Sequence, residues 1–243
     1  MKILVVRNDK LGDFMLAWPT FALLKQHWPQ AQITALVPEY TAPMGRLCPW
    51  IDSILIDDKT ESTVSLARRL RGERFDAMLT LFSTGRVALA GWLARIPYRL
   101  APATKAAQLL YNRRLTQRRS RSEKPEYAYN LDLGYRLLTD FGRLEGVQQS
   151  REENGDWLTA EIHRPLLQFN DDVAQLKESF CREHDLPGKA RLVFIHPGSG
   201  GSANNLRPEQ YAQLANRLTG AEPLAFVISA GPGEEEIARE VAS

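Results

Sequence analysis

The sequence predicts an α/β protein with mainly parallel sheets. Short apolar runs alternate with segments whose apolar residues recur at helical spacing, and this alternation is typical of βαβ units. Because crossovers between parallel strands are almost always right-handed, a doubly wound sheet with helices on both faces is expected. A polar segment over residues 144–169 interrupts the alternation, so we expect two domains, 1–165 and 166–243.

The N-terminal domain carries the clearer pattern. Strands are expected at the apolar runs Ile3–Val6, Ile33–Val37, Ile54–Ile56 and Ala77–Phe82. Helices are expected where apolar residues return every three or four positions, at Phe14–Trp28, Ser62–Arg71 and Val87–Ala94. Residues 103–141 are expected to be mainly helical, and residues 144–169 to form a linker with one strand at most.

The C-terminal domain shows the same alternation of apolar runs and helical segments. We expect strands at Leu192–Ile195 and Leu224–Ile228, and helices at Asp171–His184, from Pro208, and after the turn Gly231–Gly233. Asp171 or Asp172 suits the first N-cap, and Glu234–Glu236 suit the start of the last helix. Two clear strands are too few for a complete doubly wound domain, so this one is expected to be incomplete.

Composition excludes several classes of protein. The chain has 243 residues, of which 44% are hydrophobic and 25% charged, as in soluble globular proteins. Its net charge of +2 argues against a general nucleic-acid binder. Cys48 and Cys181 have no Cys or His cluster around them, so neither a disulfide framework nor structural zinc is expected. The apolar runs are too short for a signal peptide or a membrane span, which favours a cytoplasmic protein that at most attaches to a membrane surface.

The loop after the first strand, Arg7 to Asp13, is the first candidate site. Open α/β sheets bind their ligands at the carboxyl ends of the strands, where this loop lies. Gly12 permits close backbone approach, and Asp13 either caps the following helix or acts as a general base. The dinucleotide fingerprint GxGxxG and the phosphate loop GxxxxGK[ST] are absent, which argues against a nucleotide-dependent oxidoreductase.

The loop His196–Ser202 occupies the corresponding place in the second domain. Its glycines and serines leave backbone N–H groups free ahead of a helix, which suits phosphate binding. The alternative is a flexible connection with a structural histidine.

Four stretches of the chain together resemble glycosyltransferase family 9, the ADP-heptose lipopolysaccharide heptosyltransferases. They are ILVVRNDKLGD, Phe14–Leu24 with its internal Pro19, Phe75–Ala77, and HPGSGGSANNLRPEQYAQLA. The resemblance implies a GT-B-like architecture of two Rossmann-like domains with parallel sheets, the C-terminal one truncated here. It also implies that the N-terminal domain takes the acceptor and the C-terminal domain the nucleotide-sugar.

The resemblance assigns roles to particular residues. Asp13 matches the family's catalytic aspartate, which takes the proton of the acceptor hydroxyl while that oxygen attacks the anomeric carbon, so that the configuration inverts. The cations beside the loop and in the basic stretch are the candidates for acceptor binding: Arg7, Lys10, Arg113 and Arg114. The implied donor-binding residues are Ser199, Gly200, Gly201, Ser202, Asn205 and Arg207. Loop amides and a helix dipole would stabilise the leaving diphosphate, so neither a metal nor another cofactor is expected.

Two departures from the family pattern concern the donor. Relatives carry a lysine shortly before a Trp-Pro pair, whereas this chain has Asn205 near the lysine position and Arg207 in place of the tryptophan. The family's later donor-binding segment would lie beyond Ser243. The alternative is therefore a non-catalytic truncated remnant or an assembly component of such an enzyme.

Two basic clusters have two open interpretations. Residues Arg113–Lys124 contain six cations and one acid, Glu123, and a second cluster comprises Arg68, Arg69, Arg71 and Arg74. Each is either a solvated face or a contact for phosphate and carboxylate groups of a lipid-linked acidic saccharide acceptor or for anionic headgroups. The second interpretation places the protein at the inner face of the inner membrane. Asp57–Asp58 is expected to be a turn and not a metal site.

Overall fold

The computed structural model describes residues 1–104, 106–145, 165–169, 173–186, 191–201, 204–218 and 224–243. The chain divides into two compact units, unit 1 (Met1–Gln168) and unit 2 (Phe169–Ser243). Each unit has its own parallel sheet, which confirms the predicted α/β class.

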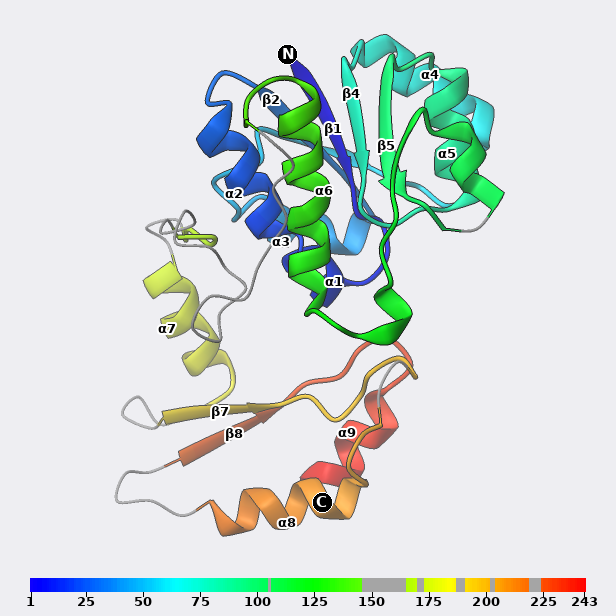
Figure 1. The fold of residues 1–243 in the computed structure, drawn as a ribbon. Coiled ribbons are helices and arrows are strands. Elements are labelled where there is room, and N and C mark those ends of the chain that lie inside the picture. The colour runs from blue at the N-terminus through cyan, green and yellow to red at the C-terminus, as the bar shows by residue number, and fades with distance from the viewer. Residues whose placement is uncertain (105, 146–164, 170–172, 187–190, 202–203, 219–223) are drawn as a thin grey trace. The chain divides into compact units, whose positions relative to one another are not determined.

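Unit 1 is built on a six-stranded sheet with the order β3-β2-β1-β4-β5-β6 (Figure 1). Every neighbouring pair is parallel, and the order is that of a Rossmann fold. The strands are β1 (Lys2–Val6), β2 (Gln32–Val37), β3 (Ser53–Ile56), β4 (Ala77–Thr80), β5 (Tyr98–Pro102) and β6 (Arg113–Leu115).

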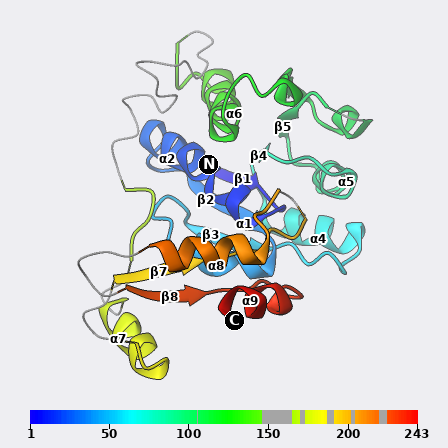
Figure 2. The same cartoon turned by 90° about the horizontal axis from the view of Figure 1, so that it is seen from below.

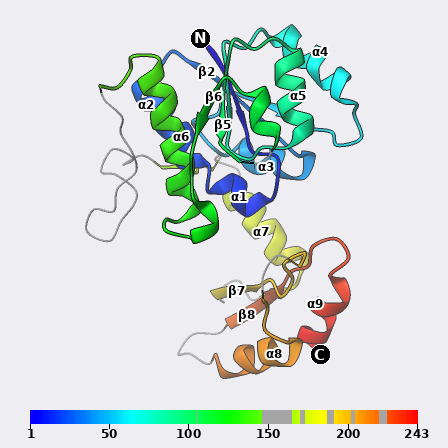
Figure 3. The same cartoon turned by 45° about the vertical axis from the view of Figure 1, so that its right-hand side comes forward.

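Helices cover both faces of this sheet. Helices α2 and α6 pack together on one face, and α4 and α5 pack together on the other (Figures 2 and 3). The helices of unit 1 are α1 (Leu11–Met15), α2 (Trp18–His27), α3 (Ala42–Gly45), α4 (Thr63–Glu73), α5 (Gly85–Leu93) and α6 (Glu126–Asp140). Short 3-10 turns are η1 (Glu39–Thr41), η2 (Ala106–Leu110) and η3 (Arg119–Arg121).

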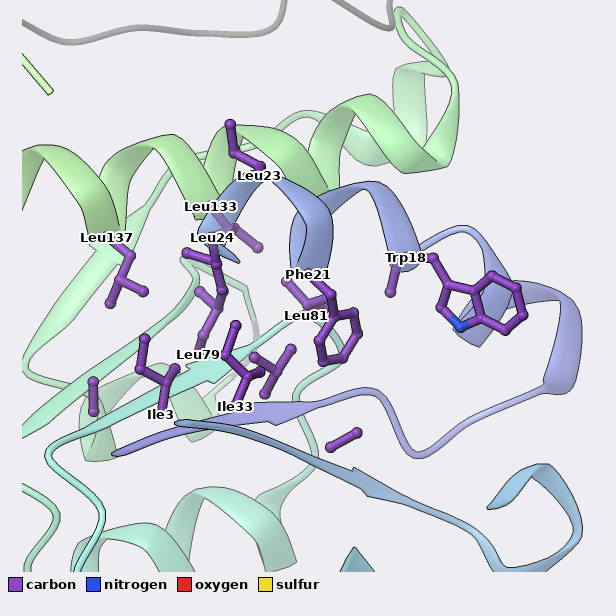
Figure 4. Packing of buried hydrophobic residues seen from close by; sticks show 14 of the residues in the cluster. Ile3, Trp18, Phe21, Leu23, Leu24, Ile33, Leu79, Leu81, Leu133 and Leu137 are labelled. Carbon is purple, nitrogen blue, oxygen red and sulfur yellow. The ribbon is translucent and has the colours of Figure 1, made fainter. Parts of the chain in front are cut away.

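The two faces explain why the central strands are apolar at every position. Ile3 and Val5 point to the α2/α6 side, whereas Leu4 and Val6 point to the α4/α5 side, and all four are fully buried. Figure 4 shows the first side, where residues of α2 and α6, among them Phe21, meet the strand residues. Sheets buried on both faces read as continuous hydrophobic runs, which is the pattern that the sequence shows.

The single helix expected at Phe14–Trp28 is wrong. The segment forms α1 and α2, separated at Leu16–Ala17. Pro19 lies in the first turn of α2, where its missing N–H costs nothing, but it would break the interior of one long helix.

The region after residue 97 also differs from the expectation. Strands β5 and β6 were not predicted, and the described part of residues 103–141 has its helical character in α6 and in the short turns η2 and η3. Strand β6 is an edge strand whose sequence, Arg-Arg-Leu, has no apolar run to mark it.

Unit 2 has a two-stranded parallel sheet of β7 (Arg191–Ile195) and β8 (Leu224–Ile228). Helix α7 (Val173–Glu183) lies on one face, and α8 (Pro208–Arg217) and α9 (Glu235–Ala242) lie on the other (Figures 1 and 3). Pro208 is the first residue of α8, as predicted. Most of the expected linker, and the N-cap candidates Asp171 and Asp172, lie outside the described residues.

Two global expectations can be compared with the described part of the chain. No helix in it is long and apolar enough to cross a membrane. Cys48 and Cys181 are both free thiols.

Candidate functional site

The first candidate loop connects β1 to α1 at the carboxyl end of the unit 1 sheet. The strand order reverses between β1 and β4, so this loop borders the topological switch point where such sheets bind ligands. Figure 1 shows α1 at this end of the sheet, beside the first turn of α6.

Arg7 is the centre of the loop, because its guanidinium is buried and contacts three carboxylates. Only 3% of its side chain is exposed. Its Nε lies 2.8 Å from Oδ1 of Asp9, and its Nη2 lies 3.1 Å from Oδ1 of Asp13. Its Nη1 lies 2.8 Å from Oε1 of Glu126 and also donates to Oδ1 of Asn130 at 3.3 Å. Each nitrogen of the guanidinium therefore has a partner.

Helix α6 supplies the far side of this cluster. Glu126, in its first turn, also forms an ion pair with Arg119. Asn130 is fully buried and donates from Nδ2 to the carbonyl oxygen of Leu16 at 3.1 Å, which ties α6 to the end of α1. The position of Arg7 is thus fixed by residues more than a hundred positions away in sequence.

The carboxylate of Asp13 is held in position and is also accessible to solvent. Its carboxylate is held by Arg7, yet 36% of its side chain is exposed. The interpretation of Asp13 as a helix cap is wrong, because Lys10 is the N-cap of α1 and Asp13 lies inside the helix in its first turn. An accessible carboxylate held in a fixed position suits the role of a general base.

The pKa values in the cluster depend on burial and on the charges of neighbouring groups. Burial raises the pKa of Asp9, and Arg7 opposes that rise. Burial by itself would lower the pKa of Arg7, but Asp9 and Glu126 more than offset it, so this pKa is raised and the guanidinium stays charged. Burial lowers the pKa of Arg119. Three carboxylates and two guanidiniums leave one formal negative charge, and Asp13 is the most exposed of the carboxylates.

Asp57 and Asp58 do not act as a pair. Asp57 is buried, accepts a hydrogen bond from Nδ2 of Asn8 at 2.5 Å and forms an ion pair with Arg86 of α5. Asp58 turns outward and accepts from the backbone N–H of Thr60 at 2.8 Å, which is the turn that the sequence predicted. Within the described ranges, no three His, Cys, Asp or Glu side chains are grouped to hold a metal ion. That no metal is required stays a prediction.

The expected acceptor residues are separated by the fold. Arg7 lies beside Asp13 but is buried, and Lys10 is exposed at the start of α1. Arg113 and Arg114 are exposed on the edge strand β6, and Arg113 lies 3.5 Å from Asp140. Contact with an acceptor stays a prediction for all four.

The basic segment 113–124 is less cationic than its sequence indicates. Lys124 lies 2.8 Å from Asp132, Arg121 lies 3.7 Å from Glu123, and Arg119 belongs to the Arg7 cluster. Arg114 and Arg118 are exposed and have no ion pair among the described residues.

In unit 2, the loop after β7 holds a carboxylate of its own chain. Gly200 and Gly201 have positive φ angles of 55° and 71°, a backbone conformation that favours glycine. The N–H of Gly200 donates to Oε1 of Glu234 at 2.6 Å, and the N–H of Gly231 donates to Oε2 at 3.2 Å. These bonds lower the pKa of Glu234, the Gly200 bond most strongly, so the loop binds this carboxylate as an anion.

The other expected donor residues lie around the same loop. The side chain of Asn205 donates to Oγ of Ser199 at 3.1 Å. Arg207 is the exposed N-cap of α8, and its backbone N–H donates to Oε1 of Gln210 at 2.9 Å. Ser202 lies outside the described residues. Phosphate contact stays a prediction for all of the expected donor residues.

Sequence reasoning missed the contact of Glu234 with this loop. The sequence placed Glu234 in the first turn of the last helix, whereas it is the N-cap of α9 and reaches back to the loop after β7. Its position directly after the turn Gly231–Gly233 was the available signal. His196 also faces it, with Nε2 at 3.7 Å from Oε2 of Glu234.

Comparison with known proteins gives a consistent set of relatives, although no family model matches the chain. A Haemophilus influenzae protein named "Putative glycosyltransferase" is 43% identical over 246 residues, which cover 100% of this chain and 67% of that protein. Lipopolysaccharide heptosyltransferase 2 of Salmonella typhimurium is 24% identical over 226 residues, covering 90% of this chain and 60% of the relative. The chain thus spans 60–67% of the length of these curated relatives.

Two solved structures have the same fold. The ADP-heptose lipopolysaccharide heptosyltransferase II of E. coli matches 99% of this chain and 68% of its own, with a TM-score of 0.74 and 22% identity. A glycosyl transferase of family 9 from Veillonella parvula matches 99% of this chain and 65% of its own, with a TM-score of 0.75 and 18% identity. These likenesses confirm the predicted GT-B-like fold class.

Proposed function

Because the chain belongs to glycosyltransferase family 9, we propose that it transfers a heptose or a related sugar from an ADP-sugar to a lipopolysaccharide core acceptor, with inversion. The named heptosyltransferases among its relatives support the class of sugar and acceptor. The E. coli structure, named for ADP-heptose, supports the donor.

The observation that carries the proposal is the state of Asp13. A carboxylate that is held by a buried guanidinium and still open to solvent can receive a proton from a bound hydroxyl. In the proposed step the acceptor oxygen forms a bond to the anomeric carbon, and its proton passes to Asp13. The bond from that carbon to the diphosphate breaks, and ADP leaves with the electron pair.

The loop after β7 would receive the diphosphate. The N–H of Gly200 in this loop, together with that of Gly231 after β8, already holds an anion, the carboxylate of Glu234, so these amides have the polarity that phosphate oxygens need. Ser199, Asn205 and Arg207 lie around the same loop and would add polar contacts. The incoming diphosphate would compete with Glu234 for the amides.

Among the acceptor residues, Lys10, Arg113 and Arg114 would attract an acidic, lipid-linked saccharide. For Arg7 the geometry favours a different role, because its nitrogens are taken by carboxylates and by Asn130. Arg7 would orient Asp13 and leave direct contact with the acceptor to the exposed cations. A lipid-linked acceptor implies work at the inner face of the inner membrane.

The test is a transfer assay with the purified chain. ADP-heptose labelled in the sugar is offered with a lipopolysaccharide core acceptor, and UDP-glucose and GDP-mannose serve as control donors. We expect transfer from ADP-heptose alone, and NMR of the product is expected to show the opposite anomeric configuration from the donor. Retention, transfer from a control donor alone, or no transfer would contradict the proposal.

A further inference from the structure

A second charged region of unit 1 lies at the amino ends of its strands. The ends of α4 and α5 and the start of β5 surround a hollow of about 470 Å³, lined by Arg71, Trp92, Leu93, Arg95, Ile96, Pro97 and Arg99. These segments lead into the amino ends of the parallel strands, whereas the loop of Asp13 follows the carboxyl end of β1. The hollow and this loop therefore lie at opposite ends of the strands. We call it the arginine hollow.

The three guanidiniums of the arginine hollow have no acidic partner among the described residues. Arg71 donates from Nη2 to the carbonyl oxygen of Leu93 at 2.9 Å. Arg99 donates from Nε to the carbonyl oxygen of Leu110 at 3.1 Å, and from Nη1 to that of Ile96. Arg95 is exposed. Carbonyl oxygens orient Arg71 and Arg99 but leave their formal charges uncompensated.

The arginine hollow differs in this respect from the other buried or half-buried arginines of unit 1. Arg7, Arg86 and Arg119 each contact at least one carboxylate. Arg99 is half-buried, and burial lowers its pKa without any carboxylate to oppose the fall. Like charges that converge on one concavity repel each other, so an anion placed between them would stabilise the arrangement.

The apolar side chains at the arginine hollow indicate that the anionic ligand also has an apolar part. Trp92 lines the arginine hollow with 51% of its surface exposed, and Leu109, one residue before the Leu110 carbonyl that Arg99 contacts, is 77% exposed. An exposed ring and an exposed aliphatic side chain next to cations suit a ligand with both a charged and an apolar part.

We propose that the arginine hollow binds a phosphate group, carried either by a small phosphorylated molecule or by a lipid headgroup. Arg95 and Arg71 are the principal contacts, and Arg99 supports the rim. The sequence cluster that contains Arg71 also contains Arg69, but the fold separates the two: Arg69 lies 2.8 Å from Glu61, whereas Arg71 joins Arg95 and Arg99. The proposal does not depend on the transferase function.

The test follows the Trp92 indole N–H by NMR while the purified chain is titrated with inorganic pyrophosphate. Comparison with Trp92→Phe assigns the signal, which separates this site from the loop after β7. We expect a saturable shift. Arg95→Gly and Arg71→Gln should each weaken it about tenfold, the usual order for losing one hydrogen bond to a charged group. Arg95→Gly suits the backbone, since Arg95 has a φ of 59°.

The matched control is Arg68→Ala, which removes an exposed cation from the same helix as Arg71 but outside the arginine hollow. It should leave the pyrophosphate affinity unchanged within about twofold. Equal weakening by Arg68→Ala and Arg95→Gly would show general surface attraction and overturn the proposal.

A second arm separates the two sources of phosphate. Vesicles of phosphatidylcholine with and without phosphatidylglycerol are sedimented with the wild type, Arg95→Gly and Arg68→Ala. Binding to the anionic vesicles that Arg95→Gly loses and Arg68→Ala keeps would support a headgroup. A pyrophosphate shift without such binding would support a small molecule. If neither pyrophosphate nor vesicles act through Arg95, the proposal is wrong.

Discussion

The loops after β1 and β7 occupy the same place in their two units but use opposite charges. In the first, the buried guanidinium of Arg7 holds carboxylates and leaves one of them, Asp13, accessible. In the second, the backbone N–H of Gly200, together with that of Gly231 in the loop after β8, holds the carboxylate of Glu234. One loop is therefore arranged to offer a negative group, and the other to surround one.

Under the proposed function, this difference would let one α/β topology supply both halves of a transfer reaction. Strand–loop–helix connections place both loops at the carboxyl ends of strands, whatever their sequence. The chemistry then depends on single residues, an arginine in the first loop and glycines with positive φ in the second. The predictions below alter these groups, from the largest expected effect to the smallest.

Removing the cation of the first loop should have the largest effect. Arg7→Ala leaves the carboxylates of Asp9, Asp13 and Glu126 without their common partner in a buried place. We expect the free energy of unfolding of unit 1 to fall by about 3–5 kcal/mol. Urea denaturation followed by tryptophan fluorescence measures it, because the sequence of unit 2 contains no tryptophan.

The control for this change is Arg121→Ala. The Arg121 side chain is 61% exposed and its ion pair with Glu123 is long, at 3.7 Å. It should cost at most about 1 kcal/mol. Equal losses for both variants would mean that the Arg7 cluster is no more than a set of surface ion pairs.

In the second loop, removing the carboxylate should free the amides. Glu234→Ala should increase the affinity of this loop for pyrophosphate about tenfold, because the anion no longer displaces a hydrogen-bonded carboxylate. The Gly200 amide signal in NMR reports the binding. Glu236→Ala removes the same charge from the same helix and should change little, since Glu236 is exposed in the first turn of α9. Unchanged or weaker binding in Glu234→Ala would show that no competition exists.

The same contact predicts a pH dependence. Hydrogen bonds from Gly200 and Gly231 lower the pKa of Glu234 from its usual value of 4.5. The contact therefore contributes its full stabilisation above pH 4.5 and loses it as the pH falls through the lowered pKa. We expect the Gly200 amide signal to titrate with a midpoint below 4.5. A midpoint at or above 4.5 would mean that the loop does not hold the carboxylate.

The smallest expected effect is a difference in alkylation rate between the cysteines of the two units, which reports how deeply each is buried. Burial raises the pKa of Cys48 in unit 1 to about 11, and only 2% of its surface is exposed. Cys181 in unit 2 is half-buried. Alkylation at pH 8, read by mass spectrometry of peptides, should modify Cys181 first, and prior modification of Cys48 would contradict the burial described here.

The sequence was informative where local pattern decides structure. Strands such as Ile3–Val6 are continuous apolar runs followed by a glycine-containing loop, so both the strand and its loop were predictable. Strands β5 and β6 were missed because charged Arg99, Arg113 and Arg114 interrupt them. The pairing of β5 with β4, and of β6 with β5, decides their structure, and no local signal reveals it.

The contacts of the two loops depend on distant residues. Asp13 and the glycines of the second loop could be singled out from their positions after a strand. The contact of Arg7 with Glu126 spans 119 residues, and that of Gly200 with Glu234 spans 34. Such partners become visible only when α6 and α9 are packed in place, so the burial of Arg7 and the role of Glu234 could not be read from one sequence.

The account depends most on Asp13 as the group that accepts the proton. Asp13→Asn keeps the shape and a hydrogen-bond acceptor for Arg7 but removes the basic oxygen. The rate of sugar transfer from ADP-heptose should fall by about 10²–10⁴-fold, while the unfolding free energy changes by at most about 1 kcal/mol, because the side chain is partly exposed. Transfer at the wild-type rate by this variant would contradict the account.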